Sequence, residues 1–264
     1  MPKFAANLTM MFNESEFLDR FESAAEAGFT AVEFLFPYSY PKHELRARIK
    51  DLGLSVVLFN LPPGRWEAGE RGIAALPGRE SEFRESVKTA LDYAEALECP
   101  RLHVMAGLIP AGAEERDFEA TYTENLRYAS RAAKSSGVAL LIEPINTRDF
   151  PGYFLYRTDQ ARRIIEKVAS DNLFLQYDVY HAQISEGFLV ETLRTNIEII
   201  RHIQVAGVPG RHEPDEHQEI NYPFLFSAID ATGYSGWIGC EYRPRGGTLQ
   251  GLAWLRPYGI KPVR

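Results

Sequence analysis

Cysteine is scarce in this sequence, which contains only Cys99 and Cys240 in 264 residues. Two cysteines cannot build a disulfide framework, so a reducing compartment is expected. The first residues, MPKFAANLTMMF, lack both the apolar core and the small-residue cleavage pattern of a signal peptide. No run approaches the ~20 apolar residues that a membrane-spanning helix needs. These absences together predict a cytoplasmic protein without a membrane segment.

Positive charge and histidine are also in short supply. The chain has 29 basic and 36 acidic residues, a formal charge of −7, and only six histidines. Surfaces that bind nucleic acids depend on clustered lysine and arginine, so no nucleic-acid partner is expected. Hydrophobic residues at 45% and charged residues at 25% are ordinary proportions for a globular protein.

A third absence concerns glycine after the first predicted strand, where the sequence reads NLTMMFNES. A doubly wound nucleotide-binding fold would normally carry a glycine-rich phosphate turn there. Short β-rich runs instead alternate with amphipathic helical segments along the whole chain, as in repeated βα units. The predicted strands cover residues 3–8, 30–36, 54–60, 101–107, 138–144, 173–178, 202–207 and 236–242. Eight strands, each followed by a helix, predict a single (β/α)₈ TIM-barrel domain over residues 1–264.

Three of these strands lead directly into an acidic residue. Glu143, Asp178 and Glu241 fall at the C-terminal ends of the fifth, sixth and eighth strands, and Gln204 lies within the seventh. Active sites of such barrels lie at that end, so the four side chains are expected to converge. Carboxylates brought so close repel one another unless a cation or shared protons compensate. Oxygen ligands favour Mg²⁺ or Mn²⁺, so the pattern predicts a divalent-metal site.

Several long motifs resemble the hydroxypyruvate isomerase family, which belongs to the xylose-isomerase-like barrels. They are LLIEPIN (140–146), DFPGY (149–153), QYDVYHAQ (176–183), HIQVAG (202–207), EINYPFLF (219–226) and GWIGCEYRP (236–244). The resemblance also includes AANLTMMF, VEFLFPY and AGERGIAALPGRE, so it covers nearly the whole chain. It implies that Glu143 and Glu241 act as acid and base. It also implies a metal site formed by Glu143, Asp178, Gln204 and Glu241, and a reaction that interconverts hydroxypyruvate and tartronate semialdehyde.

The motifs leave the substrate open between two related acids. VEFLFPY, HVMAG and AGVPGRHEPD resemble the 2-oxo-tetronate isomerases, whereas IEPIN with the downstream PGY resembles hydroxypyruvate isomerase. Two other classes were weighed: a non-catalytic sugar-acid binding protein, and a barrel that cuts abasic DNA. The second relies on a histidine-rich metal cluster and a basic groove, which this acidic chain does not offer.

Residues that bind the small-molecule substrate can also be named. Either acid carries a carboxylate, which suits bidentate recognition by arginine. Arg211, in the loop after the seventh strand, is the first candidate, with Arg65 and Arg71 as further ones. His181, three residues after Asp178, could ligate the metal or hydrogen-bond a substrate oxygen. His103, inside the fourth strand, is expected to bind substrate or to be a core histidine.

Two segments are candidates for a subunit contact in a homo-oligomer. The loop GRWEAGERG around Trp66 could instead be a lid over the substrate, and the sequence does not separate these roles. The other segment is GLAWLRPYGIKP (251–262) near the C-terminus.

Overall fold

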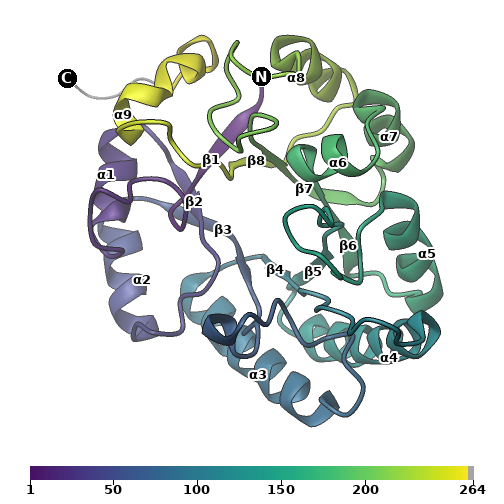
Figure 1. Ribbon diagram of the computed structural model, residues 1–264. Coiled ribbons are helices and arrows are strands. Elements are labelled where there is room, and N and C mark those ends of the chain that lie inside the picture. The colour runs from purple at the N-terminus through teal and green to yellow at the C-terminus, as the bar shows by residue number, and fades with distance from the viewer. Residues whose placement is uncertain (261–264) are drawn as a thin grey trace.

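Eight parallel strands close into a barrel in the computed structural model, which describes residues 1–260 (Figure 1). The strands pair in chain order, and β8 closes the barrel by pairing with β1, with Ala5 opposite Gly239. They are β1 Lys3–Asn7, β2 Ala31–Glu33, β3 Ser55–Asn60, β4 Arg101–His103, β5 Ala139–Ile142, β6 Leu173–Asp178, β7 Ile200–Val205 and β8 Trp237–Cys240. The TIM-barrel prediction is confirmed, while several predicted strands are shorter than expected. The single-domain prediction stays a prediction, because its last four residues lie outside the described range.

A ring of helices surrounds the barrel (Figure 1). They are α1 Arg20–Glu26, α2 Lys42–Asp51, α3 Glu80–Leu97, α4 Glu115–Lys134, α5 Thr158–Val168, α6 Val179–Ser185, α7 Leu189–Asn196, α8 Tyr222–Ala231 and α9 Thr248–Gly251, with 3-10 helices η1 Trp66–Ala68 and η2 Leu252–Tyr258. The expectation of one helix after each strand is wrong between β6 and β7, where α6 and α7 both occur. Gly187 separates them with φ of 66°, a left-handed conformation that suits glycine. None of the helices within the described range is long and apolar enough to cross a membrane.

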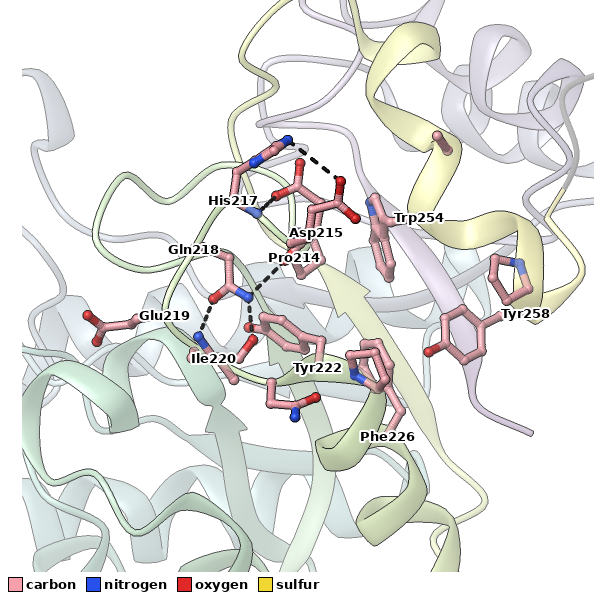
Figure 2. A pocket seen from close by; sticks show the side chains of 15 residues that line it. Pro214, Asp215, His217, Gln218, Glu219, Ile220, Tyr222, Phe226, Trp254 and Tyr258 are labelled. Atoms are coloured by element: carbon pink, nitrogen blue, oxygen red, sulfur yellow. Dashed lines mark hydrogen bonds and ion pairs between the residues drawn. The ribbon is translucent and has the colours of Figure 1, made fainter.

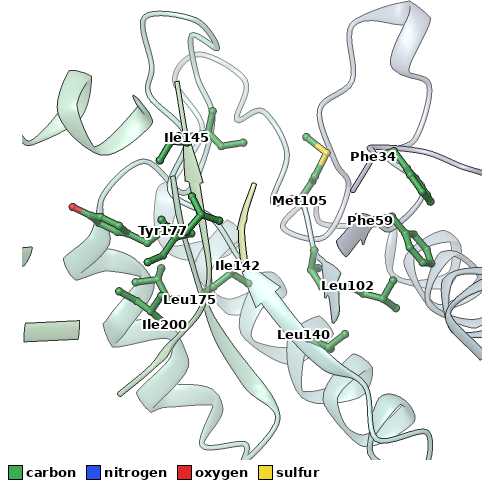
Figure 3. Close-up of a cluster of buried hydrophobic side chains, with 14 of the residues drawn as sticks. Phe34, Phe59, Leu102, Met105, Leu140, Ile142, Ile145, Leu175, Tyr177 and Ile200 are labelled. Atoms are coloured by element: carbon green, nitrogen blue, oxygen red, sulfur yellow. The ribbon is translucent and has the colours of Figure 1, made fainter. Parts of the chain in front are cut away.

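Alternation along the strands sorts apolar and polar side chains onto opposite faces of the sheet. Leu140 and Ile142 on β5, with Leu175 on β6, point outward into the core between barrel and helices (Figure 3). The intervening residues point inward, so Gln176 of β6 meets Gln204 of β7 inside the barrel. Gln176 and Asp178, two positions apart on β6, share a face of the strand, and that face therefore lines the interior.

The barrel interior changes character along its axis. At the N-terminal end, small side chains from three strands, Ala5, Ala31 and Val57, form a separate apolar cluster capped by Trp237. Toward the C-terminal end the inward positions carry amides, histidines and carboxylates. Parallel strands all end on the same side, so these polar groups collect at one mouth of the barrel.

Candidate active site

Three buried acids meet at the C-terminal mouth of the barrel. Glu143 follows β5, Asp178 ends β6 and Glu241 follows β8, and their exposed fractions are 4%, 2% and 8%. His181 lies between the first two, with Nε2 3.9 Å from Glu143 Oε1 and 3.6 Å from Asp178 Oδ2. Arg211 lies between the last two, with Nη2 3.4 Å from Asp178 Oδ2 and 3.1 Å from Glu241 Oε2. The structure thus brings these five predicted site residues together.

Burial dominates the electrostatics of the acids. It raises the pKa of Glu143 well above its usual range, and the charges of Glu241 and Asp178 raise it further. Burial also raises the pKa of Glu241 to about 8, against the opposing effect of the Arg211 guanidinium. The pKa of Asp178 is raised by burial too, although Arg211 and two backbone N–H groups oppose the shift. The carboxylates are therefore short of positive charge.

Hydrogen bonds around Asn146 fix the proton of His181. Asn146 Oδ1 accepts from the backbone N–H groups of Arg148 at 3.1 Å and Asp149 at 2.9 Å, which leaves Nδ2 as the donor facing His181. Nδ2 lies 2.7 Å from His181 Nδ1, so Nδ1 is the acceptor. Burial, together with the Arg211 charge, holds the pKa of His181 well below its usual range. The ring is neutral with its proton on Nε2, the nitrogen that faces the carboxylates.

His103, at the end of β4, lies beside Glu143, which follows the neighbouring strand β5. Its Nδ1 lies 3.5 Å from Glu143 Oε2, and the side chain is 2% exposed. Burial lowers the pKa of His103 to about 3, so the ring is neutral. Nε2 is buried without a hydrogen-bond partner in the described part of the chain. His103 is therefore next to the site rather than in a satisfied core network.

Gln204 lies deeper in the barrel than the three acids and is already hydrogen-bonded at both ends of its amide. Oε1 accepts from Gln176 Nε2 at 2.6 Å, and Nε2 donates to Glu33 Oε1 at 2.7 Å. Glu33, which ends β2 and is 1% exposed, was missed by the sequence analysis. The predicted strand over 30–36 placed it mid-strand, so it did not stand out as a strand-end acid.

A cavity of about 240 Å³ opens onto the acids and is large enough for a small ligand. Its lining includes Glu143, Glu241 and His181, and also Trp66 from η1 and Phe150. Trp66 belongs to the loop predicted as a lid or a contact, and its presence in the lining favours a lid. The described residues also form a larger cavity of about 720 Å³ outside the barrel, beneath the loop that precedes α8 and beside η2 (Figure 2). Glu143, Asp178 and Glu241 do not line that larger cavity, so size alone does not identify the site.

Of the three arginines named from the sequence, Arg211 lines the site cavity, whereas Arg65 and Arg71 do not. Arg211 is committed to Asp178 and Glu241 and lies over the Tyr180 ring, 4.9 Å from its centroid. Arg65 pairs with Glu70 and is absent from the lining of the site cavity. Arg243 lines the cavity, is exposed, and has no carboxylate within 4.0 Å in residues 1–260. Arg243 was not among the residues predicted from the sequence, although it lies two residues beyond Glu241 in the motif GCEYRP.

The donor set fits a hard divalent cation. Ligand atoms from Glu143, Asp178 and His181 all lie within 4.8 Å of one another. Glu143 Oε1 and Glu241 Oε2 are buried without a hydrogen-bond partner in the described residues, since the 3.1 Å contact of Glu241 with Arg211 lacks hydrogen-bond geometry. Because His181 presents an N–H rather than a lone pair, the carboxylate oxygens are the better ligands.

Comparison with known proteins gives consistent matches over the chain. A family model described as "Xylose isomerase-like TIM barrel" matches residues 21–258. "2-oxo-tetronate isomerase" of Cupriavidus necator is 58% identical over 258 residues, covering 98% of this chain and 99% of the relative. "Hydroxypyruvate isomerase" of Escherichia coli is 47% identical over 258 residues, with 98% and 100% covered. A crystal structure titled "AP endonuclease, family 2 from Brucella melitensis" superposes with a TM-score of 0.96 at 50% identity, covering 98% of this chain and 99% of that one.

Proposed function

The chain belongs to the xylose isomerase-like TIM barrel family, and we propose that it interconverts hydroxypyruvate and tartronate semialdehyde. Its relatives at 47% and 58% identity make it an isomerase of this kind. The observation that carries the proposal is the pair Glu143 and Glu241, which reach one 240 Å³ cavity from the ends of two different strands, β5 and β8. Two carboxyl groups that can flank a small acid supply the base and the acid that the reaction needs.

The reaction moves one proton between neighbouring carbons of the substrate. One glutamate removes a proton from C3 of hydroxypyruvate to give the enediolate, the hydroxyl proton passes from O3 to O2, and the other glutamate returns a proton at C2. Burial raises the pKa of both Glu143 and Glu241, and the charges of neighbouring acids, Asp178 among them, raise both further. Two coupled carboxyl groups then favour a state in which one is protonated and the other is ionised.

Other side chains hold the substrate and stabilise negative charge on its oxygens. His181 presents its Nε2–H toward the cavity, where it can donate to the oxyanion of the enediol. Arg243 lines the cavity, has no carboxylate within 4.0 Å among residues 1–260, and can pair with the substrate carboxylate. Arg211 keeps a supporting role in this scheme, because Asp178 and Glu241 already bind it.

Mg²⁺ or Mn²⁺ is the proposed cofactor. Glu143, Asp178 and Glu241 would hold it, with Gln204 as a neutral oxygen ligand, and the bound cation would polarise the carbonyl and hydroxyl oxygens of the substrate. The unpartnered buried oxygens of Glu143 and Glu241 support this assignment.

2-Oxo-tetronate is a second candidate substrate, favoured by the relative at 58% identity. The two acids share the carboxylate and the C2–C3 proton transfer, and they differ in a hydroxymethyl group on C3. The polar side chains Thr9, Asn13 and Asn60 line the same cavity and could accommodate that group. The chemistry of the glutamates would be unchanged.

The Brucella melitensis structure bears the name of an AP endonuclease, as the abasic-site hypothesis would expect. The site of the present chain, however, gives that hypothesis little support. The chain carries a formal charge of −7, and the cavity is of a size for a small acid. A phosphate backbone would meet three buried carboxylates and few cations. A non-catalytic binding protein would not need two opposed acids.

The test is a turnover assay with hydroxypyruvate and with 2-oxo-tetronate, each with Mg²⁺ and again after chelation. Preference for hydroxypyruvate supports the first proposal, and preference for the four-carbon acid supports the second. Glu143→Gln and Glu241→Gln should each lower kcat by about 10²–10⁴-fold while the fold survives. Glu166→Gln, on the exposed face of α5, is the matched control. Wild-type turnover in either catalytic variant would remove that glutamate from the mechanism, and binding without turnover would favour the non-catalytic alternative.

Two broader proposals accompany this function. A cytoplasmic location agrees with the two free, buried cysteines. A homo-oligomer through the segment 251–262 is the second, and light scattering would test it; residues 261–262 of that segment lie outside the described range.

The Trp66 ring packs against Phe36, with 5.0 Å between the ring centroids, and beneath the guanidinium of Arg71. This packing supports the lid role of the loop over the contact role.

A further inference from the structure

A fourth buried acid, Glu33, lies in the barrel below the acids of the site. Both its oxygens accept hydrogen bonds: Oε1 from Asn7 Nδ2 at 3.0 Å and Gln204 Nε2 at 2.7 Å, and Oε2 from His202 Nε2 at 2.6 Å. The side chain is 1% exposed. Burying a carboxylate is costly unless donors compensate, and here three side chains from two other strands do so.

Space for Glu33 is provided by the neighbouring wall of the barrel. Gly239 of β8 faces the Glu33 carboxylate so closely that an added Cβ would collide with both carboxylate oxygens. Gln204 is paired in register with Gly239 on one side and with Asp178 on the other. Gln204 therefore connects Glu33, to which it donates a hydrogen bond, with Asp178, its strand neighbour among the acids of the site.

The Glu33 carboxylate determines the orientation of the Gln204 side-chain amide. Glu33 Oε1 accepts hydrogen bonds from Asn7 Nδ2 and from Gln204 Nε2, so the atom of Gln204 that faces Glu33 is the nitrogen. The oxygen is then on the other side of the amide, where it accepts one bond from Gln176 Nε2 at 2.6 Å. A carbonyl oxygen has two lone pairs, so one remains for a further partner. A small cavity of about 20 Å³ adjoins Gln204 and is also lined by Glu143 and Glu241.

We propose that Glu33 is a positioning residue, which binds the amide nitrogen of Gln204 and so presents the amide oxygen to the divalent cation held by the site acids. The inference rests on the metal site of the proposed function. Without Glu33 the two amide ends of Gln204 are nearly equivalent in shape, and the –NH₂ end, which cannot ligate a cation, competes for the same place. Residues that orient ligands from outside typically change metal affinity by about 10–100-fold.

The test is Mn²⁺ affinity measured by electron paramagnetic resonance on the full chain, without substrate. Glu33→Gln can donate to the Gln204 oxygen and permits the wrong orientation, so we expect Mn²⁺ affinity to fall by about 10–100-fold. Asn7→Ala removes another partner of the same Glu33 oxygen without touching Gln204, and should leave the affinity within about threefold. Circular dichroism and thermal melting check that each variant folds.

A rescue variant separates orientation from charge. In the double variant Glu33→Gln/Gln204→Glu, residue 204 offers an oxygen whichever way it turns, and the total charge equals that of the wild type. Recovery of Mn²⁺ affinity supports the proposal, also where Glu33→Gln alone fails to fold. Equal weakening in the single and double variants overturns it, as does wild-type affinity in Glu33→Gln.

Turnover measured on the same preparations distinguishes this inference from the proposed function. If Mn²⁺ affinities follow the pattern above while the wild type turns over neither acid, the positioning role stands and the proposed substrates are wrong. If the wild type is active but binds no Mn²⁺, the positioning role is overturned and the isomerase assignment survives. In an active, metal-dependent enzyme, Glu33→Gln should also lower kcat more than it changes KM at saturating metal.

Discussion

Asn146→Asp is expected to move the proton of His181 from Nε2 to Nδ1. The aspartate keeps one oxygen for the two backbone N–H groups that Asn146 Oδ1 now binds at 3.1 and 2.9 Å. Its second oxygen replaces Nδ2, 2.7 Å from His181 Nδ1, and can only accept. The imidazole must then donate from Nδ1, and its Nε2 lone pair faces Glu143 and Asp178.

The expected cost has a structural and a catalytic part. The new carboxylate loses the 3.2 Å hydrogen bond to Asp149 Oδ2 and meets a like charge there, which should destabilise the fold by about 2–4 kcal/mol. Loss of one N–H donor to a developing oxyanion typically costs about 10²–10³-fold in kcat. KM should change less, because the lost interaction is made chiefly in the transition state.

Nitrogen-15 NMR of histidine-labelled protein reads the proton directly, since the two neutral tautomers and the imidazolium give different ring shifts. The His181 signals are assigned by their loss in His181→Gln. Asn221→Asp is the matched control, because Asn221 caps α8 by accepting from Phe224 N at 3.2 Å, a role aspartate fills equally well. A neutral Nε2-protonated His181 with normal kcat in Asn146→Asp would refute the reasoning.

Three further outcomes follow from particular contacts. Arg243→Gln should raise KM for the acid by about 10–100-fold with little change in kcat or melting temperature, because its guanidinium is free at the cavity mouth; steady-state kinetics would contradict this if KM were unchanged. Hydrogen bonds from Arg79 lower the pKa of Glu70 to about 2 from 4.5. Its ion pairs therefore stabilise the fold fully above about pH 4.5, by on the order of 1–3 kcal/mol, and this is lost as the pH falls toward 2. Urea titrations of wild type and Glu70→Gln should converge over that range, and a constant difference would argue against it. Gly239→Ala should destabilise the chain by about 1–3 kcal/mol and weaken Mn²⁺ binding, because the added carbon collides with Glu33; unchanged urea denaturation would disprove the tight packing.

The fold was predictable because its information is local and repeated. Each strand is visible in the sequence as a short apolar run. The absence of a glycine-rich turn after the first strand argued against the main competing fold, the doubly wound nucleotide-binding fold. The positions of Glu143, Asp178 and Glu241 followed from one rule about barrel strands. The boundaries were less predictable: residues 14–28 look helical throughout, yet only Arg20–Glu26 forms a helix. Arg20 donates to Ser15 O and Leu8 O, and these tertiary bonds hold the preceding turns in another shape.

The features that sequence reasoning missed all depend on partners distant in the chain. Glu33 is one residue of a strand, and its role comes from His202 and Gln204, about 170 positions away. The tautomer of His181 is set by Asn146, and in the sequence Asn146 is only a loop residue three positions after Glu143. Arg243, unlike Arg211, has no acid within 4.0 Å among residues 1–260. Pairings of this kind carry no periodicity, so no local pattern predicts them.

The Glu33 layer also explains why the inward positions of β2, β7 and β8 differ so much in size. A carboxylate on β2 and an amide on β7 can share a hydrogen bond across the barrel axis only if the third wall is empty, and Gly239 leaves it empty. Below this layer the axis is filled by small apolar groups such as Ala5 and Ala31. The layer beneath is apolar and the layer above is polar, so the Glu33 carboxylate lies at the boundary between them. Conversion of that layer to apolar side chains could preserve the barrel, but it would leave the amide of Gln204 without a preferred direction.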